Sequence, residues 1–218
     1  MHPEIRSFPS RHFYDGKLTD GACVVAAPDE VFYGLPPLGP YAFFDVPGGR
    51  EDRRGGGSLM NAAEGRVVLS LLSLLSQAVR ARLAAGTSLS RPYQVAVITP
   101  YREQKAHLSR LLASRRGDVG LPAFDPAHIA IDTVDSFQGK QVDVVIMSCV
   151  RTDPSGRIGF VADVRRLNVS ITRAKRALWI VGSCQALEAS NATWKALIDD
   201  ARGRQCFHSP HTCPEVYA

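Results

Sequence analysis

The segment between Ile129 and Gly182 constrains the fold of this chain most strongly. A short β-rich run from His128 to Ile131 is followed by a polar Gln-Gly turn, and then by an apolar run from Val142 to Val150. That run is long and apolar enough to form a central parallel strand covered on both faces. A basic segment and a second apolar run, which ends at Gly182, follow at once. This alternation of strands and helices predicts an α/β fold with a mostly parallel sheet.

The basic segment is predicted to be one helix with two distinct faces. At about 100° per residue, Arg166 and Arg173 lie seven positions apart and share a face, while apolar residues gather on another that packs on the sheet. Because buried cations without partners are prohibitively costly, we expect an anionic partner at the arginine face. A solvated basic helix beside Asp163 is the alternative. The cations are Arg165, Arg166, Arg173, Lys175 and Arg176, and the apolar residues are Leu167, Ile171, Ala174 and Leu178.

The other segments extend the same alternation. A broad apolar face over Asn61 to Ala85 predicts a long helix against the sheet. We assign residues 1–205 to one domain and expect residues 206–218 to be a disordered tail. The remaining elements are expected as a short helix near the N-terminus, strands at Ala22–Ala26, Tyr41–Val46 and Gln94–Ile98, a flexible loop at Gly48–Gly57, and helices up to about Ala113 and over Trp194–Ala201.

Composition supports one folded domain in a reducing environment. A chain of 218 residues, 45% of them hydrophobic, can bury a full core. The net charge of +5 is compatible with a nucleic-acid partner. We find no run of about 18 apolar residues and no signal-peptide pattern, so we expect an intracellular protein, nuclear or cytoplasmic, that is neither secreted nor bound in a membrane. The five cysteines are odd in number and scattered, which favours reduced thiols.

The C-terminal tail holds two cysteines and two histidines. Their spacing fits no common zinc module, and short loops between ligands would strain tetrahedral geometry. We therefore expect no metal site. The four residues are Cys206, His208, His211 and Cys213.

Four segments, in this order, resemble the C-terminal RecA-like domain of a superfamily 1 helicase, in the group that includes senataxin and the nonsense-mediated decay helicase. The resemblance implies a RecA-like, three-layer P-loop-NTPase fold, of which this chain would be the second motor domain only. The segments are MHPEIRSFPSRHFYDGKL at Met1–Leu18, VITPYREQ at Val97–Gln104, TVDSFQGKQVDVVIMSCVR at Thr133–Arg151, and GFVADVRRLNVSITRAKRALWIVG at Gly159–Gly182.

The resemblance also implies a nucleotide site. In such helicases, ATP with Mg²⁺ binds between two RecA-like domains, and the second domain supplies an arginine finger, which matches Arg173 here. Arg166 is the next candidate. Gln138 and Gly139 match a loop that couples the nucleotide to the nucleic-acid groove. Relatives usually carry Glu two residues after that glycine, where this chain has Gln141, so a ribose or water contact from that position loses a charge.

A nucleic-acid contact is implied at two strand ends. Locally, Thr99, Pro100 and Tyr101 are sufficiently explained as a strand-to-helix junction with Thr as cap and Pro near the first turn. In relatives this segment faces a bound single strand of RNA or DNA, where hydroxyls and a helix N-terminus can hold phosphates. Thr133 is placed similarly at the next strand end.

Two parts of a complete motor are missing from the sequence. It contains neither a G-x-x-x-x-G-K-[ST] phosphate loop nor a strand that ends in a magnesium-binding Asp-Glu pair. We therefore expect a fragment of a longer helicase, in which Met1 is an internal residue, with an N-terminal RecA-like domain of the same parent chain as partner. A stand-alone nucleic-acid-binding module without ATPase activity is the alternative, and a structural scaffold in which Arg173 is dispensable is a third.

Overall fold

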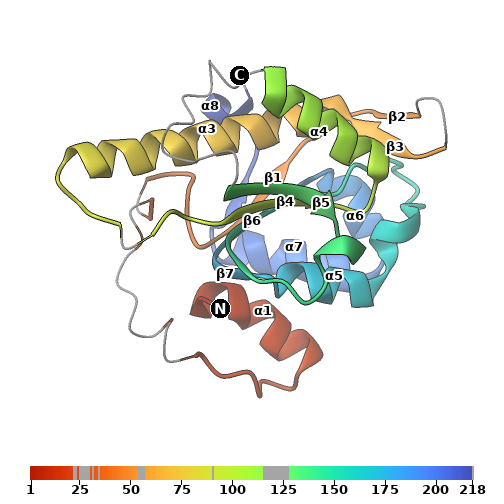
Figure 1. Ribbon diagram of the computed structural model, residues 1–218. Coiled ribbons are helices and arrows are strands. Elements are labelled where there is room, and N and C mark those ends of the chain that lie inside the picture. Colours follow the sequence, from red (N-terminus) through yellow and green to blue (C-terminus); the bar gives the residue numbers. More distant parts are fainter. Residues whose placement is uncertain are drawn as a thin grey trace.

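A computed structural model describes residues 1–21, 24, 30, 32–33, 35–53, 57–89, 91–114 and 128–217 of the chain. Within these ranges, the centre of the molecule is a parallel sheet with strand order β5-β4-β6-β7-β1-β8 (Figure 1). A separate antiparallel hairpin joins β2 to β3. The strands are β1 (Tyr41–Asp45), β2 (Glu51–Arg53), β3 (Leu59–Asn61), β4 (Val95–Thr99), β5 (Ile129–Thr133), β6 (Val142–Ser148), β7 (Ala174–Gly182) and β8 (Phe207–His208).

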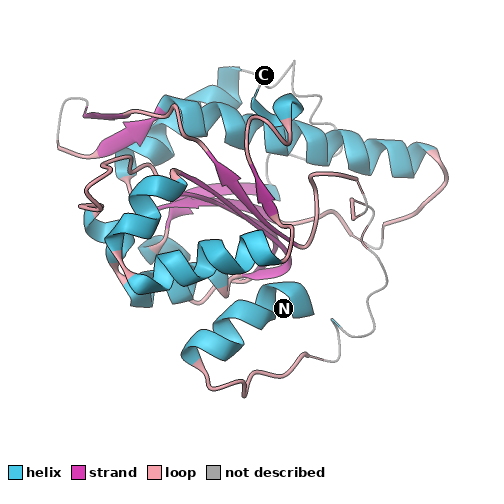
Figure 2. Ribbon diagram, turned by 180° about the vertical axis from the view of Figure 1, so that it is seen from behind, coloured by secondary structure: helices cyan, strands magenta, loops and turns pink. Residues whose placement is uncertain are grey.

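Helices cover both faces of the sheet, which makes the three-layer α/β arrangement expected for a RecA-like domain (Figures 1 and 2). On one face lie α3 (Ala62–Ala84), α4 (Arg102–Ser114) and α8 (Pro214–Tyr217). On the other lie α1 (Pro3–Phe13), α5 (Val164–Ile171), α6 (Cys184–Ser190) and α7 (Ala192–Gly203), with the short 3-10 turns η3 (Asp135–Phe137) and η4 (Gly159–Ala162) near the strand ends.

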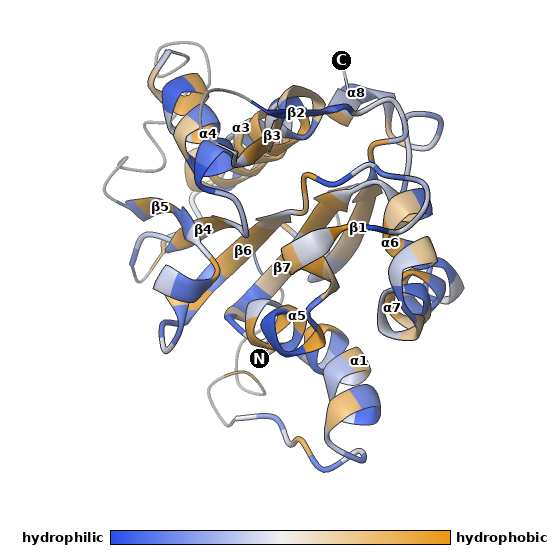
Figure 3. Ribbon diagram, turned by 90° about the vertical axis from the view of Figure 1, so that its right-hand side faces the viewer, coloured by the Kyte–Doolittle hydropathy of each residue, from blue (hydrophilic) through white to orange (hydrophobic). Residues whose placement is uncertain are grey.

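Alternate side chains of the central strands divide the core into two layers. In β6, Val144 and Ile146 pack towards α3, whereas Val145 and Met147 pack towards α5 and α7. All four are at most 2% exposed. Figure 3 shows the strands as a hydrophobic band between the two helical layers. The apolar run from Val142 is therefore a strand buried on both faces, as its composition predicts.

Most expected elements lie where the sequence places them. The helix over Asn61–Ala85 is α3, and Asn61 caps it by accepting hydrogen bonds from the Ala63 and Glu64 amides. The strand expected near Ala22–Ala26 lies outside the described residues except for Val24. Within the loop expected over Gly48–Gly57, residues Glu51–Arg53 instead form strand β2 because they pair with β3, and residues 54–56 lie outside the described ranges. By length and composition α3 could cross a membrane, although we expected no such segment, and half of its most apolar window is buried in the fold.

The basic segment differs from the single helix that we expected. Helix α5 ends at Ile171, where Thr172 caps it by donating from its hydroxyl to the carbonyls of Asn168 and Val169, at 2.8 and 3.1 Å. Lys175 and Arg176 lie instead on β7, which pairs with both β6 and β1. Pairing and burial of this strand between β6 and β1 stabilise it more than continuation of the helix would, so the tertiary context overrides the local helical pattern.

The C-terminal segment also differs from the disordered tail that we expected. Phe207 stacks on Phe43 with ring centroids 5.6 Å apart, and β8 pairs with β1. Val216 in α8 is fully buried against the layer that contains α3. Cys213 lies with its Sγ 3.3 Å from Nδ1 of His208, but the described residues contain no group of three or more potential metal ligands. Aromatic stacking and apolar burial hold this segment in place.

Candidate functional site

The predicted site residues lie at opposite ends of the parallel sheet. Arg173 and the loop Gln138–Gln141 lie where β6 and β7 begin, and we call this region the arginine edge. Thr99 and Thr133 lie where β4 and β5 end. Because all these strands are parallel, their carboxyl ends share the edge at which open α/β sheets bind ligands, and the arginine edge is the opposite one.

The guanidinium group of Arg173 is held entirely by neutral oxygen atoms. Its Nε donates to the Val169 carbonyl at 2.9 Å, one Nη donates to Thr172 Oγ1 at 3.1 Å, and the other donates to the Lys140 carbonyl at 3.4 Å. Arg173 forms no salt bridge with any carboxylate of the described residues. Its positive charge is therefore oriented but not compensated.

Two neighbouring arginines are compensated, which makes the state of Arg173 informative. Arg176 forms ion pairs with Glu30 and with Asp143, the latter at 3.2 Å. Asp143 is 1% exposed and also receives two hydrogen bonds of 2.7 Å from Arg91. Arg166 donates to both carboxylate oxygens of Asp135 at 3.1 and 3.3 Å. Arg165 and Lys175 also form no ion pair with the described residues, so Arg173 is distinguished by the three neutral oxygens that orient it and not by the lack of a carboxylate alone.

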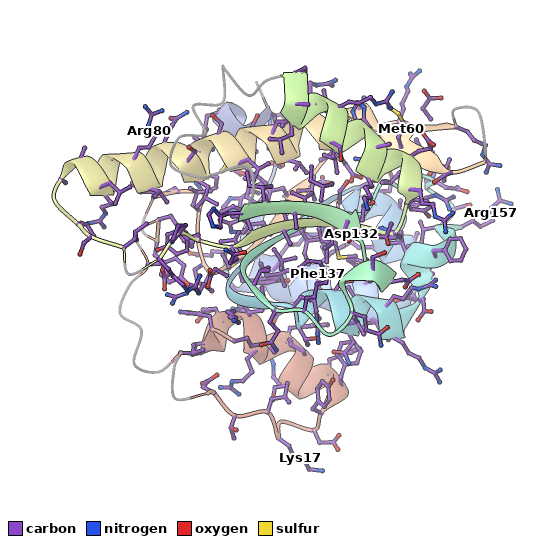
Figure 4. The ribbon with its side chains drawn as sticks, in the orientation of Figure 1. Lys17, Met60, Arg80, Asp132, Phe137 and Arg157 are labelled. Atoms are coloured by element: carbon purple, nitrogen blue, oxygen red, sulfur yellow. The ribbon has the colours of Figure 1, made fainter. Side chains whose placement is uncertain are left out.

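The loop Gln138–Gln141 reaches the arginine edge through a glycine in the left-handed region. Gly139 has φ +81°, and a Cβ built there would meet nothing within 4 Å. The requirement for glycine within this chain is therefore conformational rather than one of close packing. Lys140 lies over the buried ring of Phe137 at 5.6 Å, which anchors the loop, while Gln138 and Gln141 are exposed (Figure 4, where Phe137 is labelled).

The first residues of the chain lie at the same edge. The amide of His2 donates to the carbonyl of Lys175 at 2.8 Å. In turn, the Val142 amide donates to the carbonyl of Arg173 at 3.2 Å. Three segments that are distant in the sequence therefore converge there, namely the N-terminus, the loop before β6 and the turn before β7.

A cleft of about 400 Å³ opens near the other end of the sheet. It brings together Pro100, Tyr101 and Thr133 from the predicted nucleic-acid contacts, and Arg166 from the predicted catalytic set. Polar groups and two arginines share its surface with an aromatic ring, that of Phe160. The full lining is Gly57, Ser58, Pro100, Tyr101, Arg102, Thr133, Val134, Asp135, Phe160 and Arg166.

The predicted contacts differ in how far they are open to this cleft. Thr99 is fully buried, and its hydroxyl accepts a hydrogen bond from the Tyr101 amide at 3.4 Å. Tyr101 is 6% exposed, and its hydroxyl donates to the Ile158 carbonyl at 3.1 Å. Tyr101 forms part of the wall and Thr99 lies behind it, whereas Thr133 offers a hydroxyl that also contacts Ser136 at 2.9 Å.

Arg166 belongs to the cleft and not to the arginine edge. It lies in the first turn of α5, where Asp163 caps the helix by accepting from the Arg165 and Arg166 amides. Arg173 follows the other end of the same helix. Seven residues of helix span about 10 Å along the axis. The expectation that Arg166 and Arg173 share one helical face is therefore wrong, because α5 ends before Arg173.

A buried polar network lies behind the cleft, and we did not predict it. The carboxyl group of Glu64 accepts from the Val150 amide at 2.8 Å and from the Ser148 hydroxyl at 2.7 Å. Gln104 joins the network by donating to Ser148 Oγ at 3.0 Å. Burial raises the pKa of Glu64 to about 8, although these hydrogen bonds act to lower it. The spacing of Asn61 and Glu64 at the start of α3 was the available signal.

The sequence is similar to one protein family and to several helicases. A family described as the AAA domain matches residues 1–185. Helicase SEN1 of Saccharomyces cerevisiae is 34% identical over 95% of this chain, and Probable helicase MAGATAMA 3 of Arabidopsis thaliana is 38% identical over 94%. Regulator of nonsense transcripts 1 homolog of Drosophila melanogaster is 35% identical over 94%. The chain spans 9%, 24% and 16% of these three relatives, respectively.

Proposed function

The chain belongs to the superfamily 1 helicases of the senataxin and nonsense-mediated decay group, and on this basis we propose that it is the second motor domain of an ATP-dependent RNA or DNA helicase. The observation that carries the proposal is the uncompensated guanidinium of Arg173, which three neutral oxygens orient at an edge where three segments converge. The parent protein would act inside the cell, in the nucleus or the cytoplasm.

The donor set at the arginine edge fits a triphosphate. A guanidinium fork matches phosphate oxygens, and one whose only acceptors are neutral oxygens keeps its charge for such a ligand. Arg173 would contact the phosphate end, with Gly139 and Gln141 lining the approach. ATP with Mg²⁺ supplies the phosphoryl group that is transferred to water, and its main site is proposed on an N-terminal motor domain of the parent chain.

Arg173 would act by stabilising negative charge that develops as the phosphoryl group is transferred. The hydrogen bond from Nε to the Val169 carbonyl fixes the plane of its guanidinium group before any ligand binds. Less side-chain entropy is then lost when the fork meets an anion. Removal of this group should raise the activation free energy of hydrolysis by several kcal/mol, because the group stabilises the transition state and not the bound ground state.

Gln138 would couple the two ends of the domain. The turn η3 starts at Asp135, which lines the cleft, and its C-terminal cap is Gln138, which begins the loop at the arginine edge. A shift of Asp135 on binding in the cleft would therefore pass through a single short turn to the loop whose Lys140 carbonyl accepts from Arg173.

The cleft would hold part of a single strand of nucleic acid. Thr133 provides a hydroxyl, Pro100 lies just before the N-terminus of α4, and Arg102 adds an exposed cation. Such groups suit phosphates and do not read sequence. Thr99 is fully buried and does not line the cleft, so it would act only by holding the Tyr101 amide.

The experiment is a chimera in which this chain replaces the matching segment of Helicase SEN1. ATP hydrolysis that depends on single-stranded nucleic acid would support the proposal. A SEN1 variant that lacks the matching segment is the baseline. A folded chimera that binds both ATP and nucleic acid, yet hydrolyses no more ATP than this baseline, would contradict it.

One observation favours a second candidate, a stand-alone nucleic-acid-binding module. The sequence holds no phosphate loop of the G-x-x-x-x-G-K-[ST] type, so the chain alone has no cradle for a nucleotide. A module of this kind would bind single strands equally well with or without a first motor domain. Titration of an oligonucleotide against the chain, with the SEN1 first motor domain added in trans, separates the two: a motor half should bind more tightly when its partner and ATP are present.

A further inference from the structure

We infer that Phe160 is a stacking platform for an unpaired base of the bound strand, an inference that rests on the nucleic-acid role proposed for the cleft. Phe160 is 62% exposed, the highest value among the exposed large hydrophobic residues in the described ranges. Its ring lines the cleft together with Thr133 and Arg166. An aromatic ring held open to solvent beside cations and hydroxyls suits a ligand with flat apolar rings and a charged backbone.

The backbone around Phe160 is held in place by its neighbours, so the exposed ring keeps a defined position at the cleft. Ile158 and Val161, on either side, are 1% and 3% exposed. The Ile158 carbonyl accepts from the Tyr101 hydroxyl at 3.1 Å, and the Val161 carbonyl accepts from the indole of Trp194 at 2.8 Å. Apolar anchors and carbonyl contacts thus hold a turn whose central side chain points away from the core.

One face of the ring is occupied by a fixed cation. The guanidinium carbon of Arg166 lies 5.1 Å from the ring centroid of Phe160, within the range of a cation–π contact. Asp135 holds the same guanidinium group through both carboxylate oxygens. A base would stack on the opposite face of the ring, because Phe160 remains 62% exposed with the cation in place.

The surroundings favour a nucleic acid over a protein partner. Protein docking surfaces gather apolar residues around an aromatic anchor. Pro100, Tyr101 and Val134 also line the cleft, but Tyr101 and Val134 are at most 6% exposed. The cation of Arg102 and the hydroxyls of Ser58 and Thr133 share its surface. Arg157, three residues before the ring, is also exposed and projects from the surface of the fold (Figure 4). Hydroxyls and cations suit phosphates, which leaves the ring as the group for a base.

The test compares a short oligouridylate with an abasic oligomer of the same length, by fluorescence anisotropy at low salt, using the 218-residue chain. Phe160→Ala should weaken binding of the oligouridylate by roughly 5- to 100-fold and leave the abasic oligomer nearly unchanged. Phe160→Trp should retain the preference for bases. Because Phe160→Ala removes no charge, the slope of log affinity against log salt should stay the same, whereas Arg102→Ala should reduce it by about one.

Leu83→Ala is the matched control, because Leu83 is a 42% exposed apolar residue on α3, outside the cleft. Photocross-linking of 5-iodouridine should map to the peptide that contains Phe160. Equal loss on both oligomers, or no loss on either, would overturn the stacking role while leaving the nucleic-acid proposal intact. Failure of the wild-type chain to bind either oligomer would overturn both. A Phe160→Ala defect that appears only as weaker association with the SEN1 first motor domain would mean that the ring is a protein contact.

Discussion

At the scale of single residues, charge compensation separates arginines that the sequence presents as equivalent. Arg166, Arg173 and Arg176 occur within eleven positions of one another, but two of them meet carboxylates in the folded chain and one does not. The partners Asp135 and Asp143 come from other segments, so no pattern within the basic segment reveals which arginines stay uncompensated. Arg165 also lacks an ion pair with the described residues, and Arg173 differs from it in that three neutral oxygens orient its guanidinium group. The resemblance to helicases predicts the role of Arg173, and that role stays a prediction.

Glu64 leads to a prediction about pH. Its pKa in the folded chain is about 8, above the usual 4.5, so its contribution to stability is fully present below about pH 4.5 and is lost as the pH rises to about 8. Glu64→Gln resembles the protonated acid and does not titrate. The free energy of unfolding of the wild type should therefore fall relative to that of Glu64→Gln across this window, as measured by urea denaturation at several pH values.

The matched control is Glu103→Gln, which removes a partly exposed carboxylate from the first turn of α4. The free energy of unfolding of the wild type should not fall relative to that of Glu103→Gln across this window. A constant difference between wild type and Glu64→Gln from pH 4.5 to pH 8 would show that Glu64 is already ionised in the folded chain, and that its hydrogen bonds outweigh the cost of burial.

At the scale of elements, a glycine in the loop after β6 gives a prediction about stability. Gly156 has φ +75°, and a Cβ there would press against the Ala189 carbonyl and lie 2.8 Å from the Ser190 amide nitrogen. Gly86 has φ +87° but open space around it. We expect Gly86→Ala to cost about 1 kcal/mol of unfolding free energy, from backbone strain alone, and Gly156→Ala several kcal/mol.

Urea denaturation of the two variants measures the difference. Because both positions carry a left-handed backbone, Gly86→Ala controls for strain, and the excess cost in Gly156→Ala reports the contact with the end of α6. Equal costs for the two substitutions would mean that this loop and α6 move apart readily, and that the turn bearing Phe160 is less firmly held than its contacts imply.

Some elements follow from local sequence patterns, and others depend on distant segments. Apolar strands such as β6, and the long amphipathic α3, were predicted because their patterns are local and long. The end of α5 was not predicted. Whether the residues after Arg173 continue the helix or form a strand depends on their pairing with β1 and β6, which are other segments of the chain. The order of β8 and α8 depends likewise on Phe43 and on α3, which are distant in the sequence.

For the candidate site, the structure shows which predicted residues lie together, and their roles stay predictions. Pro100, Tyr101 and Thr133 come together at one cleft, as adjacent parallel strand ends require. Phe160 and Glu64 were missed, because exposure of an aromatic ring and burial of a carboxylate are properties of packing that composition does not carry.

At the scale of the whole molecule, the chain alone should not hydrolyse ATP. The phosphate loop is missing from the sequence, and an arginine finger acts only on a nucleotide held by another domain.

The isolated chain should nonetheless bind single strands weakly, with a dissociation constant of roughly 10⁻⁴ to 10⁻⁶ M that rises with salt. Phosphate release measures ATP hydrolysis, and fluorescence anisotropy measures nucleic-acid binding. ATP hydrolysis by the pure chain that nucleic acid stimulates would contradict the proposal that the main nucleotide site lies on another domain.

We propose that Arg173 completes a nucleotide site between two motor domains, and the decisive measurement is ATP hydrolysis by Arg173 variants of the SEN1 chimera. Steady-state hydrolysis should fall about 10³-fold or more in Arg173→Ala with nucleic-acid affinity nearly intact, and Arg173→Lys should not restore it because a single ammonium lacks the fork. Arg165→Ala is the control, an exposed arginine on α5 that forms no ion pair in the part of the chain described. Near wild-type turnover in Arg173→Ala would contradict the account.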